Sequence, residues 1–285
     1  MSLSNIITSH SVENRLTYFA KKGEKYAAKG IQYDPYDRSK NVLLCFSLFR
    51  RIRLPILSIQ YINSIIYDFP VPQEYVPLAS LADVLKTASQ IPENIAFIIT
   101  SLAGKNGSHA NLIVFNKPKK RIDIFDPLGK FGNTEYGEER DLQEFIVNEF
   151  ICNIDDEYTL YCETLEVGIQ VADYKYSKRR EGAGFCRVWV WLVAQLCSEF
   201  PNKTLREIVG NMTECADTSS INICRGFLAE TREHTCKMMQ NRNSDFSKLY
   251  LELREAPVQS GKARNSYCAS EKMAMEYLRK VGGGK

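Results

Sequence analysis

Two short apolar runs near the middle of the chain have the composition of β-strands. Residues 108–116 (SHANLIVFN) and 121–129 (RIDIFDPLG) are rich in β-branched and aromatic side chains, and the break between them contains Pro118. This pattern predicts a β-hairpin. A turn centred between Lys117 and Pro118 pairs residues whose numbers sum to 235. It therefore places His109 directly opposite Asp126, with Cβ atoms about 5 Å apart.

The run that follows Cys186 differs from these strands because it is apolar on nearly every face, as expected of a helix buried in a core. Gly182 and Gly184 form a loop-like approach to this run, so Cys186 is expected at or near the helix N-terminus. Elsewhere, periodicity predicts helices at 11–29, 78–88, 138–152, 205–215, 221–240 and 268–280, and strands at 96–102, 159–164 and 167–174. Residues 41–67 have mixed periodicity, which fits a helix followed by a short strand.

Strands in the middle of the chain with helices on either side predict an α+β fold. In this fold a mixed or antiparallel central sheet packs against the buried helix that bears the candidate nucleophile, and further helices flank both. The 285 residues, of which 44% are hydrophobic, are enough to bury a sizeable core. One compact domain with extensions is therefore expected.

His109, Asp126 and Cys186 are the residue types that a thiolate enzyme needs. The Asp126 carboxylate would hold the tautomer of His109 and stabilise its charged form. At a helix N-terminus, the free N–H groups, the helix dipole and a neighbouring imidazolium all favour the thiolate of Cys186. Each residue also has a simpler explanation: Cys186 as a small core residue, His109 as a satisfied histidine at a strand end, and Asp126 as the start of a turn before Pro127 and Gly129.

Three motifs support a resemblance to a known family: a strand that begins with histidine, a strand end with the pattern FDPxG, and a GxC motif followed by tryptophans. In this chain they are HAN at 109–111, FDPLG at 125–129 and GFCRVWVW at 184–191. The block from residue 96 to 200 resembles the cysteine peptidase superfamily of the adenovirus maturation protease and the SUMO-specific proteases. Its pattern is most similar to members encoded by large DNA viruses. The resemblance implies a catalytic triad in the order His109, Asp126 and Cys186, with no cofactor and no metal ion.

Members of this superfamily usually carry a glutamine shortly before the cysteine, and its side-chain amide joins the backbone N–H of that cysteine in the oxyanion hole. The immediate approach to Cys186 contains no glutamine, and the nearest candidate is Gln170, in the predicted strand 167–174. Gln170 is therefore the expected oxyanion donor, and an ordinary glutamine on a surface strand is an equal alternative. Because loss of one such donor costs about 100-fold to 1000-fold in turnover, this assignment affects the mechanism more than the class of enzyme.

The resemblance, taken with the pattern of elements, divides the chain into three parts. Residues 1–77 form an N-terminal helical extension suited to substrate docking, 78–255 a cysteine peptidase-like catalytic domain, and 256–285 a linker and C-terminal helix with a Gly-rich tail. The expected function is that of a thiol-dependent peptidase or isopeptidase acting on polypeptides, either viral precursors or ubiquitin-like conjugates. The alternatives are an acyl- or acetyltransferase with the same triad and a catalytically degenerate binding scaffold. The Gly-Gly sequence at 282–284 is a candidate self-processing site.

Composition limits the kinds of partner that the protein is expected to have. The formal charge of +3 is too small to predict nucleic acid as the principal partner. The chain starts without a signal-like pattern and its longest hydrophobic stretch, 54–67, is interrupted by polar residues, so no membrane span is expected.

Nine cysteines without a regular framework suit a reducing compartment, namely the cytoplasm, or the host cytoplasm or virion if the protein is viral. The spacing of Cys215, Cys224, His234 and Cys236 is not that of a zinc knuckle. The substrate and the oligomeric state stay open.

Overall fold

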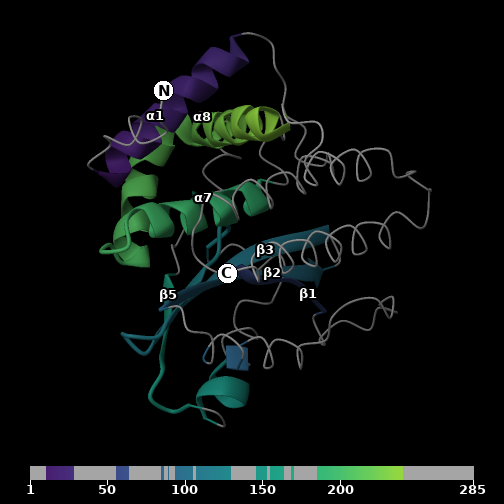
Figure 1. Cartoon of the computed structure of the whole chain (residues 1–285), viewed down its shortest axis with the longest axis vertical. Coiled ribbons are helices and arrows are strands. Elements are labelled where there is room, and N and C mark those ends of the chain that lie inside the picture. The colour runs from purple at the N-terminus through teal and green to yellow at the C-terminus, as the bar shows by residue number, and fades with distance from the viewer. Residues whose placement is uncertain are drawn as a thin grey trace, which may run out of the picture.

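The structure is a computed structural model that describes residues 11–28, 56–63, 85–86, 89, 94–104, 107–129, 146–152, 155–163, 168–169 and 185–239. In this part of the chain, helices combine with a small mixed sheet. The predicted α+β class is therefore confirmed at this level. Figure 1 shows helix α7 between the sheet on one side and the helix pair α1 and α8 on the other.

Among the residues that the structure describes, the sheet has five strands in the spatial order β1-β2-β3-β4-β5. Their bounds are β1 Ile56–Asn63, β2 Ile95–Gly104, β3 Gly107–Asn116, β4 Arg121–Phe125 and β5 Thr159–Glu163. The outer pairs, β1 with β2 and β4 with β5, are parallel, whereas β2 with β3 and β3 with β4 are antiparallel. The predicted strands at 96–102, 108–116 and 159–164 are confirmed, and β1 lies within the segment 41–67 whose pattern was mixed.

The hairpin of β3 and β4 forms as predicted, but its register is not the predicted one. Asn116 pairs with Arg121, and the ladder ends where Leu112 pairs with Phe125, so partner numbers sum to 237 rather than 235. The direct pairing of His109 with Asp126 is therefore wrong, because both residues lie beyond the end of this ladder. An error of two residues nevertheless keeps each side chain on its predicted face of the sheet.

The local chemistry of the turn explains the shift. Residues 117–120 all belong to the turn, which is closed by a hydrogen bond from the Lys120 N–H to the Lys117 carbonyl at 3.0 Å. Pro118 occupies the second position, which suits its fixed φ. The Asn116 side chain accepts a hydrogen bond from the Lys119 N–H at 3.2 Å, and Lys120 adopts a positive φ of 47°. The turn is therefore centred between Pro118 and Lys119, one residue later than the arithmetic assumed.

In the described part of the chain, three long helices accompany the sheet: α1 Val12–Ala27, α7 Cys186–Glu199 and α8 Leu205–Met239. α1 confirms the predicted helix at 11–29, and it begins where the Ser11 side chain accepts a hydrogen bond from the Asn14 N–H at 3.1 Å. The prediction of two helices at 205–215 and 221–240 is wrong, because the backbone of α8 continues as one helix through the polar residues between them. None of the described helices combines the length and the apolarity that crossing a membrane requires.

The remaining predicted elements are described only in part. Residues 85–86 are helical within the predicted helix 78–88, and residue 89, just beyond it, is helical as well. A turn of π-helix, η2 Ile146–Ile151, lies within the predicted helix 138–152. In the predicted strand 167–174, Ile169 is helical, so the strand prediction is wrong at that residue. Apart from Gly168, which is described, the rest of that segment lies outside the described residues, as do the helix predicted at 268–280 and the Gly-rich tail.

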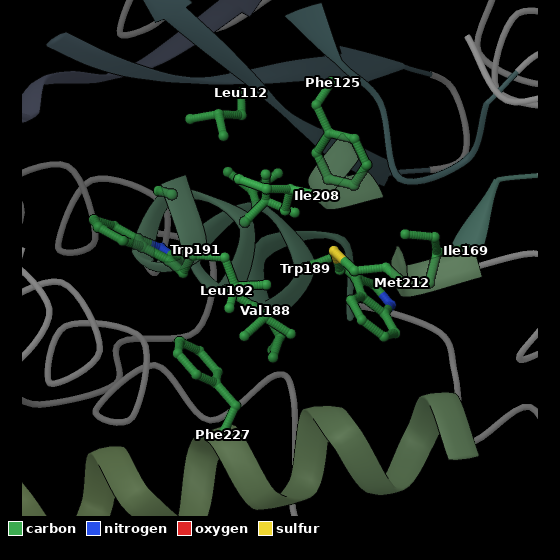
Figure 2. Packing of buried hydrophobic residues seen from close by; sticks show 14 of the residues in the cluster. Leu112, Phe125, Ile169, Val188, Trp189, Trp191, Leu192, Ile208, Met212 and Phe227 are labelled. Carbon is green, nitrogen blue, oxygen red and sulfur yellow. The ribbon is translucent and has the colours of Figure 1, made fainter. Parts of the chain in front are cut away.

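The hydrophobic core lies around α7, whose described side chains from Cys186 to Cys197 are all buried. Figure 2 shows that Trp189 and Trp191 of this helix share one cluster with Leu112 and Phe125 from the sheet and Phe227 from α8. The opposite face of the sheet is buried as well, with these side chains: Ala96, Ile98, Ile113, Phe115, Ile122 and Ile124. Because α7 is held by close packing from both layers, its first residue is attached to a rigid support.

The first helix is integrated into this core. Gly23 of α1 and Gly226 of α8 mark a close crossing, where an added Cβ would lie 1.9 Å from a backbone carbonyl oxygen of the other helix. The guanidinium of Arg15 donates two hydrogen bonds to Glu199 of α7 and two to Glu230 of α8, at distances from 2.9 to 3.1 Å. The predicted boundary at residue 77 stays a prediction, but α1 and β1, which both precede it, pack and pair with elements that follow it.

Candidate active site

His109 and Asp126 form a buried contact. The Nε2 atom of His109 lies 2.6 Å from Oδ1 of Asp126, and the two side chains are only 4% and 3% exposed. The contact predicted from the sequence therefore exists, although the register that was used to derive it is wrong. The two residues meet across the diverging ends of β3 and β4, where His109 pairs with Leu102 of β2 instead.

The turn after β4 fixes the position of the Asp126 carboxylate. Its Oδ1 atom accepts a second hydrogen bond from the Leu128 N–H at 2.7 Å, and the Gly129 N–H donates to the Asp126 carbonyl at 3.1 Å. Gly129 has a positive φ of 61°, a conformation that glycine adopts without strain. The FDPLG sequence thus forms a tight turn, and this turn aims the carboxylate at the imidazole. The turn role and the orienting role of Asp126 are compatible.

Cys186 is the first residue of α7, as the sequence predicted. Phe185 occupies the N-cap position, and its side chain has no atom that could accept a hydrogen bond from the N–H groups of the first turn. Those N–H groups and the helix dipole therefore favour negative charge at this end of α7. Cys186 is 6% exposed and forms part of the same cluster as Phe185 and Trp189. The cysteine is thus both a core residue and the start of the helix.

His109 lies between the other two residues, since its side chain hydrogen-bonds to Cys186 as well as to Asp126. Burial alone would lower the pKa of His109, but the charge and hydrogen bond of Asp126, followed by those of Cys186, outweigh it and raise this pKa to about 10. The interaction is reciprocal, so a protonated His109 favours the thiolate of Cys186. With Nε2 directed at Asp126, Nδ1 is the ring nitrogen that remains for the thiol.

Cys152, Cys197 and Cys224 are the other cysteines whose side chains the structure describes. Cys197 lies near the C-terminal end of α7 and is buried. Its burial, together with the nearby Asp123, raises the pKa of its thiol well above the usual range. Cys152 is exposed, and none of Cys152, Cys186, Cys197 and Cys224 takes part in a disulfide. A neutral buried thiol is a poor nucleophile. For Cys186, by contrast, its charge and its hydrogen bond to His109 both contribute to the raised pKa of that histidine.

The other sequence-based candidates stand apart. Gln170, the expected oxyanion donor, lies outside the described residues, directly after Gly168 and Ile169, which are described. Of the four residues considered for zinc, Cys224 alone has a described side chain, and it is buried in the core. Within the described part of the chain, no group of three or more histidine, cysteine and acidic side chains could hold a metal ion.

Gly168 is the feature of the site that sequence reasoning missed. Its N–H donates to the Leu128 carbonyl at 3.1 Å, so it contacts the turn that carries Asp126. A signal was present, because an isolated glycine within a strand-like pattern indicates close approach of another backbone.

Comparisons with protein-family models and with curated proteins find no match for this chain.

Proposed function

We propose that the chain is a thiol-dependent peptidase or isopeptidase, in which Cys186 is the nucleophile, His109 the base and Asp126 the residue that orients the base. The single observation that carries this proposal is the position of His109, which is hydrogen-bonded on one side to Asp126 at 2.6 Å and on the other to Cys186. This arrangement matches what thiolate catalysis requires, namely a nucleophile, a base within hydrogen-bonding reach, and a third group that holds the base.

Two further features support the assignment. Cys186 opens a helix whose first-turn N–H groups donate no hydrogen bond to the N-cap side chain, so both the thiolate and a developing oxyanion are favoured there. The raised pKa of His109 means that the imidazolium form predominates at neutral pH, and an imidazolium beside Cys186 favours its thiolate over its thiol. The buried helix α7 is then the nucleophile-bearing helix of the predicted fold.

In the first half of the reaction the Cys186 thiolate attacks the carbonyl carbon of the substrate. A C–S bond forms, and the carbonyl electrons move to oxygen, where N–H groups at the start of α7 stabilise the charge. The oxyanion then collapses, the C–N bond breaks, and the His109 imidazolium gives its proton to the departing amine. The product of this half-reaction is a thioester on Cys186 and a neutral His109.

In the second half a water molecule attacks the thioester carbonyl. Neutral His109 takes a proton from the water while a bond forms between the water oxygen and the carbonyl carbon. The C–S bond then breaks, which releases the acid and restores the Cys186 thiolate. Asp126 keeps its hydrogen bond to Nε2 throughout, which holds the ring in one orientation and stabilises each imidazolium stage.

The resemblance to the adenovirus maturation protease and the SUMO-specific proteases extends this proposal to a substrate class. The substrate would be a polypeptide, either a viral precursor or a conjugate of a ubiquitin-like protein, and the reaction would take place in the cytoplasm or in a virion. Gln170 would supply the side-chain donor of the oxyanion hole. These finer assignments rest on the motifs around His109, Asp126 and Cys186.

Covalent trapping tests the proposal directly. Wild-type protein, Cys186→Ala and the matched control Cys197→Ala, which alters another cysteine of the same helix, are each incubated with ubiquitin, SUMO and peptide electrophiles under reducing conditions. Intact-mass spectrometry should detect an adduct with the wild type and with Cys197→Ala, but none with Cys186→Ala. Circular dichroism establishes that both variants are folded.

The same three proteins are then added to a cell lysate, and new N-termini are mapped by mass spectrometry. Loss of the nucleophile should lower turnover by about 10⁶-fold, so products that form equally with Cys186→Ala would refute the proposal. Absence of both adducts and products in the wild type would favour a binding scaffold. Acetyl-coenzyme A-dependent modification of lysine or hydroxyl groups would instead indicate an acetyltransferase.

A further inference from the structure

Gly168 packs directly on the backbone of the turn that carries Asp126. A Cβ atom added at this position would lie 2.1 Å from the Leu128 carbonyl carbon, 2.3 Å from the Pro127 carbonyl oxygen and 2.4 Å from the Gly129 nitrogen. All three are backbone atoms, so no side-chain rotation can relieve the overlap. Position 168 therefore accommodates no residue larger than glycine unless the turn moves.

The residue after Gly168 fixes the segment on its other side. Ile169 is buried in the same hydrophobic cluster as Phe185 and Cys186, and Figure 2 shows its side chain with those of the core around α7. The segment 168–169 is thus held by the Asp126 turn at one residue and by the core that surrounds the nucleophile helix at the next. It connects the two structural units from which the candidate site is built.

A continuous set of hydrogen bonds leads from Gly168 to the imidazole. The Gly168 N–H donates to the Leu128 carbonyl at 3.1 Å, and the Leu128 N–H donates to Oδ1 of Asp126 at 2.7 Å. The same Oδ1 atom lies 2.6 Å from Nε2 of His109. A displacement of Leu128 is therefore transmitted to the carboxylate oxygen that orients the base.

We infer that Gly168 is a positioning residue of this site, whose missing side chain allows the segment 168–169 to set the Asp126 turn and, through it, the orientation of His109. Its importance for turnover rests on the proposed function, but the geometry that it controls does not. Gly168 touches no reacting atom, so its role is exerted through Leu128 and Asp126.

The overlap sets the size of the expected effect. Ordinary van der Waals contact begins at 3.4 Å, so an alanine Cβ at 2.1 Å must separate from Leu128 by about 1.3 Å. If the Asp126 carboxylate follows this movement away from the imidazole, its 2.6 Å hydrogen bond lengthens beyond the range of a hydrogen bond. A misplacement of about 1 Å in a catalytic group costs on the order of 100-fold in rate.

Three alanine variants of glycine isolate this effect. Gly168→Ala overlaps with the Asp126 turn, Gly226→Ala overlaps equally closely with α1 but far from the turn in the chain, and Gly210→Ala places its methyl group in open space. The pKa of His109 is measured in each by NMR on protein with labelled histidine. The chain has three histidines, so the His109 signal is identified as the one lost in His109→Gln.

In Gly168→Ala the pKa of His109 should fall from about 10 toward its ordinary value of 6.5, because the charge and hydrogen bond of Asp126 that raise it are displaced while burial, which lowers it, remains. In Gly226→Ala and Gly210→Ala it should stay where it is. If the peptidase activity is present, kcat of Gly168→Ala should decrease about 100-fold with little change in KM.

An unchanged pKa of His109 in a folded Gly168→Ala protein would overturn the inference and leave the proposed function untouched. The opposite outcome is a shifted pKa of His109 in Gly168→Ala together with a wild-type protein that cleaves no substrate. It would support the positioning role and count against the proposed function. If Gly168→Ala does not fold, Ile169→Ala replaces it, since this variant releases the segment from the core without adding an atom. The pKa of His109 should then fall as well, and an unchanged value would overturn the inference.

Discussion

Replacement of Asp126 by asparagine should change how the stability of the protein depends on pH. Asparagine has nearly the same shape and retains an oxygen that can accept the Leu128 N–H, so the main change is loss of the carboxylate charge beside His109. The comparison is best made in a Cys186→Ser chain, because serine can still hydrogen-bond to His109 but does not ionise in this range. The effect of Asp126 on His109 is then isolated from that of the thiolate.

The sign follows from the raised pKa of His109. Its folded value of about 10 lies above the ordinary value of 6.5 that applies to the unfolded chain, so the folded state holds the proton more tightly. The resulting stabilisation is fully present below pH 6.5 and is lost as the pH rises through about 10. With about 1.4 kcal/mol for each unit, the contribution is at most about 5 kcal/mol, and it is smaller in the Cys186→Ser chain, which lacks the thiolate charge that adds to the rise.

Urea unfolding measures this contribution. The chain has two tryptophans, Trp189 and Trp191, and both are buried in α7, so their fluorescence reports on loss of the core. The Asp126→Asn chain should be less stable than its parent at pH 6.5, and the difference should shrink by up to about 1.4 kcal/mol per pH unit toward pH 10. A His109→Gln control should show no such slope. A difference between parent and Asp126→Asn that does not vary over this interval would refute the reasoning.

Three further predictions concern other parts of the molecule. At about pH 6, Cys186 should be alkylated faster than the exposed Cys152, because a protonated His109 favours the thiolate; peptide mapping checks this, and preferential labelling of Cys152 would contradict it. Arg15→Met should lower the free energy of unfolding by about 3 to 5 kcal/mol in urea, because two largely buried carboxylates lose their shared partner; a loss below about 1 kcal/mol would count against the ion-pair argument. Gly226→Ala should destabilise the protein by about 1 to 3 kcal/mol through overlap with α1, whereas Gly210→Ala should stabilise α8 by up to about 1 kcal/mol; an increase in Tm for Gly226→Ala would show that the helix crossing is not tight.

The hairpin illustrates what could be predicted from the sequence and what could not. The strand propensities of residues 108–116 and 121–125 are local, so β3 and β4 were predictable. The register depends on the backbone of the turn, where Lys120 adopts a positive φ that its residue type does not suggest. The contact between His109 and Asp126 was predicted despite this, since the error of two residues preserves the alternation of faces.

Long-range packing accounts for the features that the sequence did not reveal. The polar residues between 215 and 221 suggested a break in α8, but helix propensity is a weak guide and the backbone continues through them. The burial of Arg15 depends on two carboxylates that are 184 and 215 residues away in the chain. The close approach of Gly168 to Leu128 likewise becomes visible only once the segments are placed together. By contrast, the position of Cys186 at the start of a buried helix follows from local periodicity alone.

The ion pairs of Arg15 also delay the packing of α1 while the protein is being synthesised. α1 leaves the ribosome before its partners, because Glu199 and Glu230 are made 184 and 215 residues after Arg15. At a translation rate of about 5 to 20 residues per second, α1 waits roughly 10 to 40 seconds for its binding partners. During that interval its apolar residues, among them Leu16 and Phe19, lack the core that later buries them. A nascent chain in this state presents an amphipathic helix to molecular chaperones, and release from them would coincide with completion of α8.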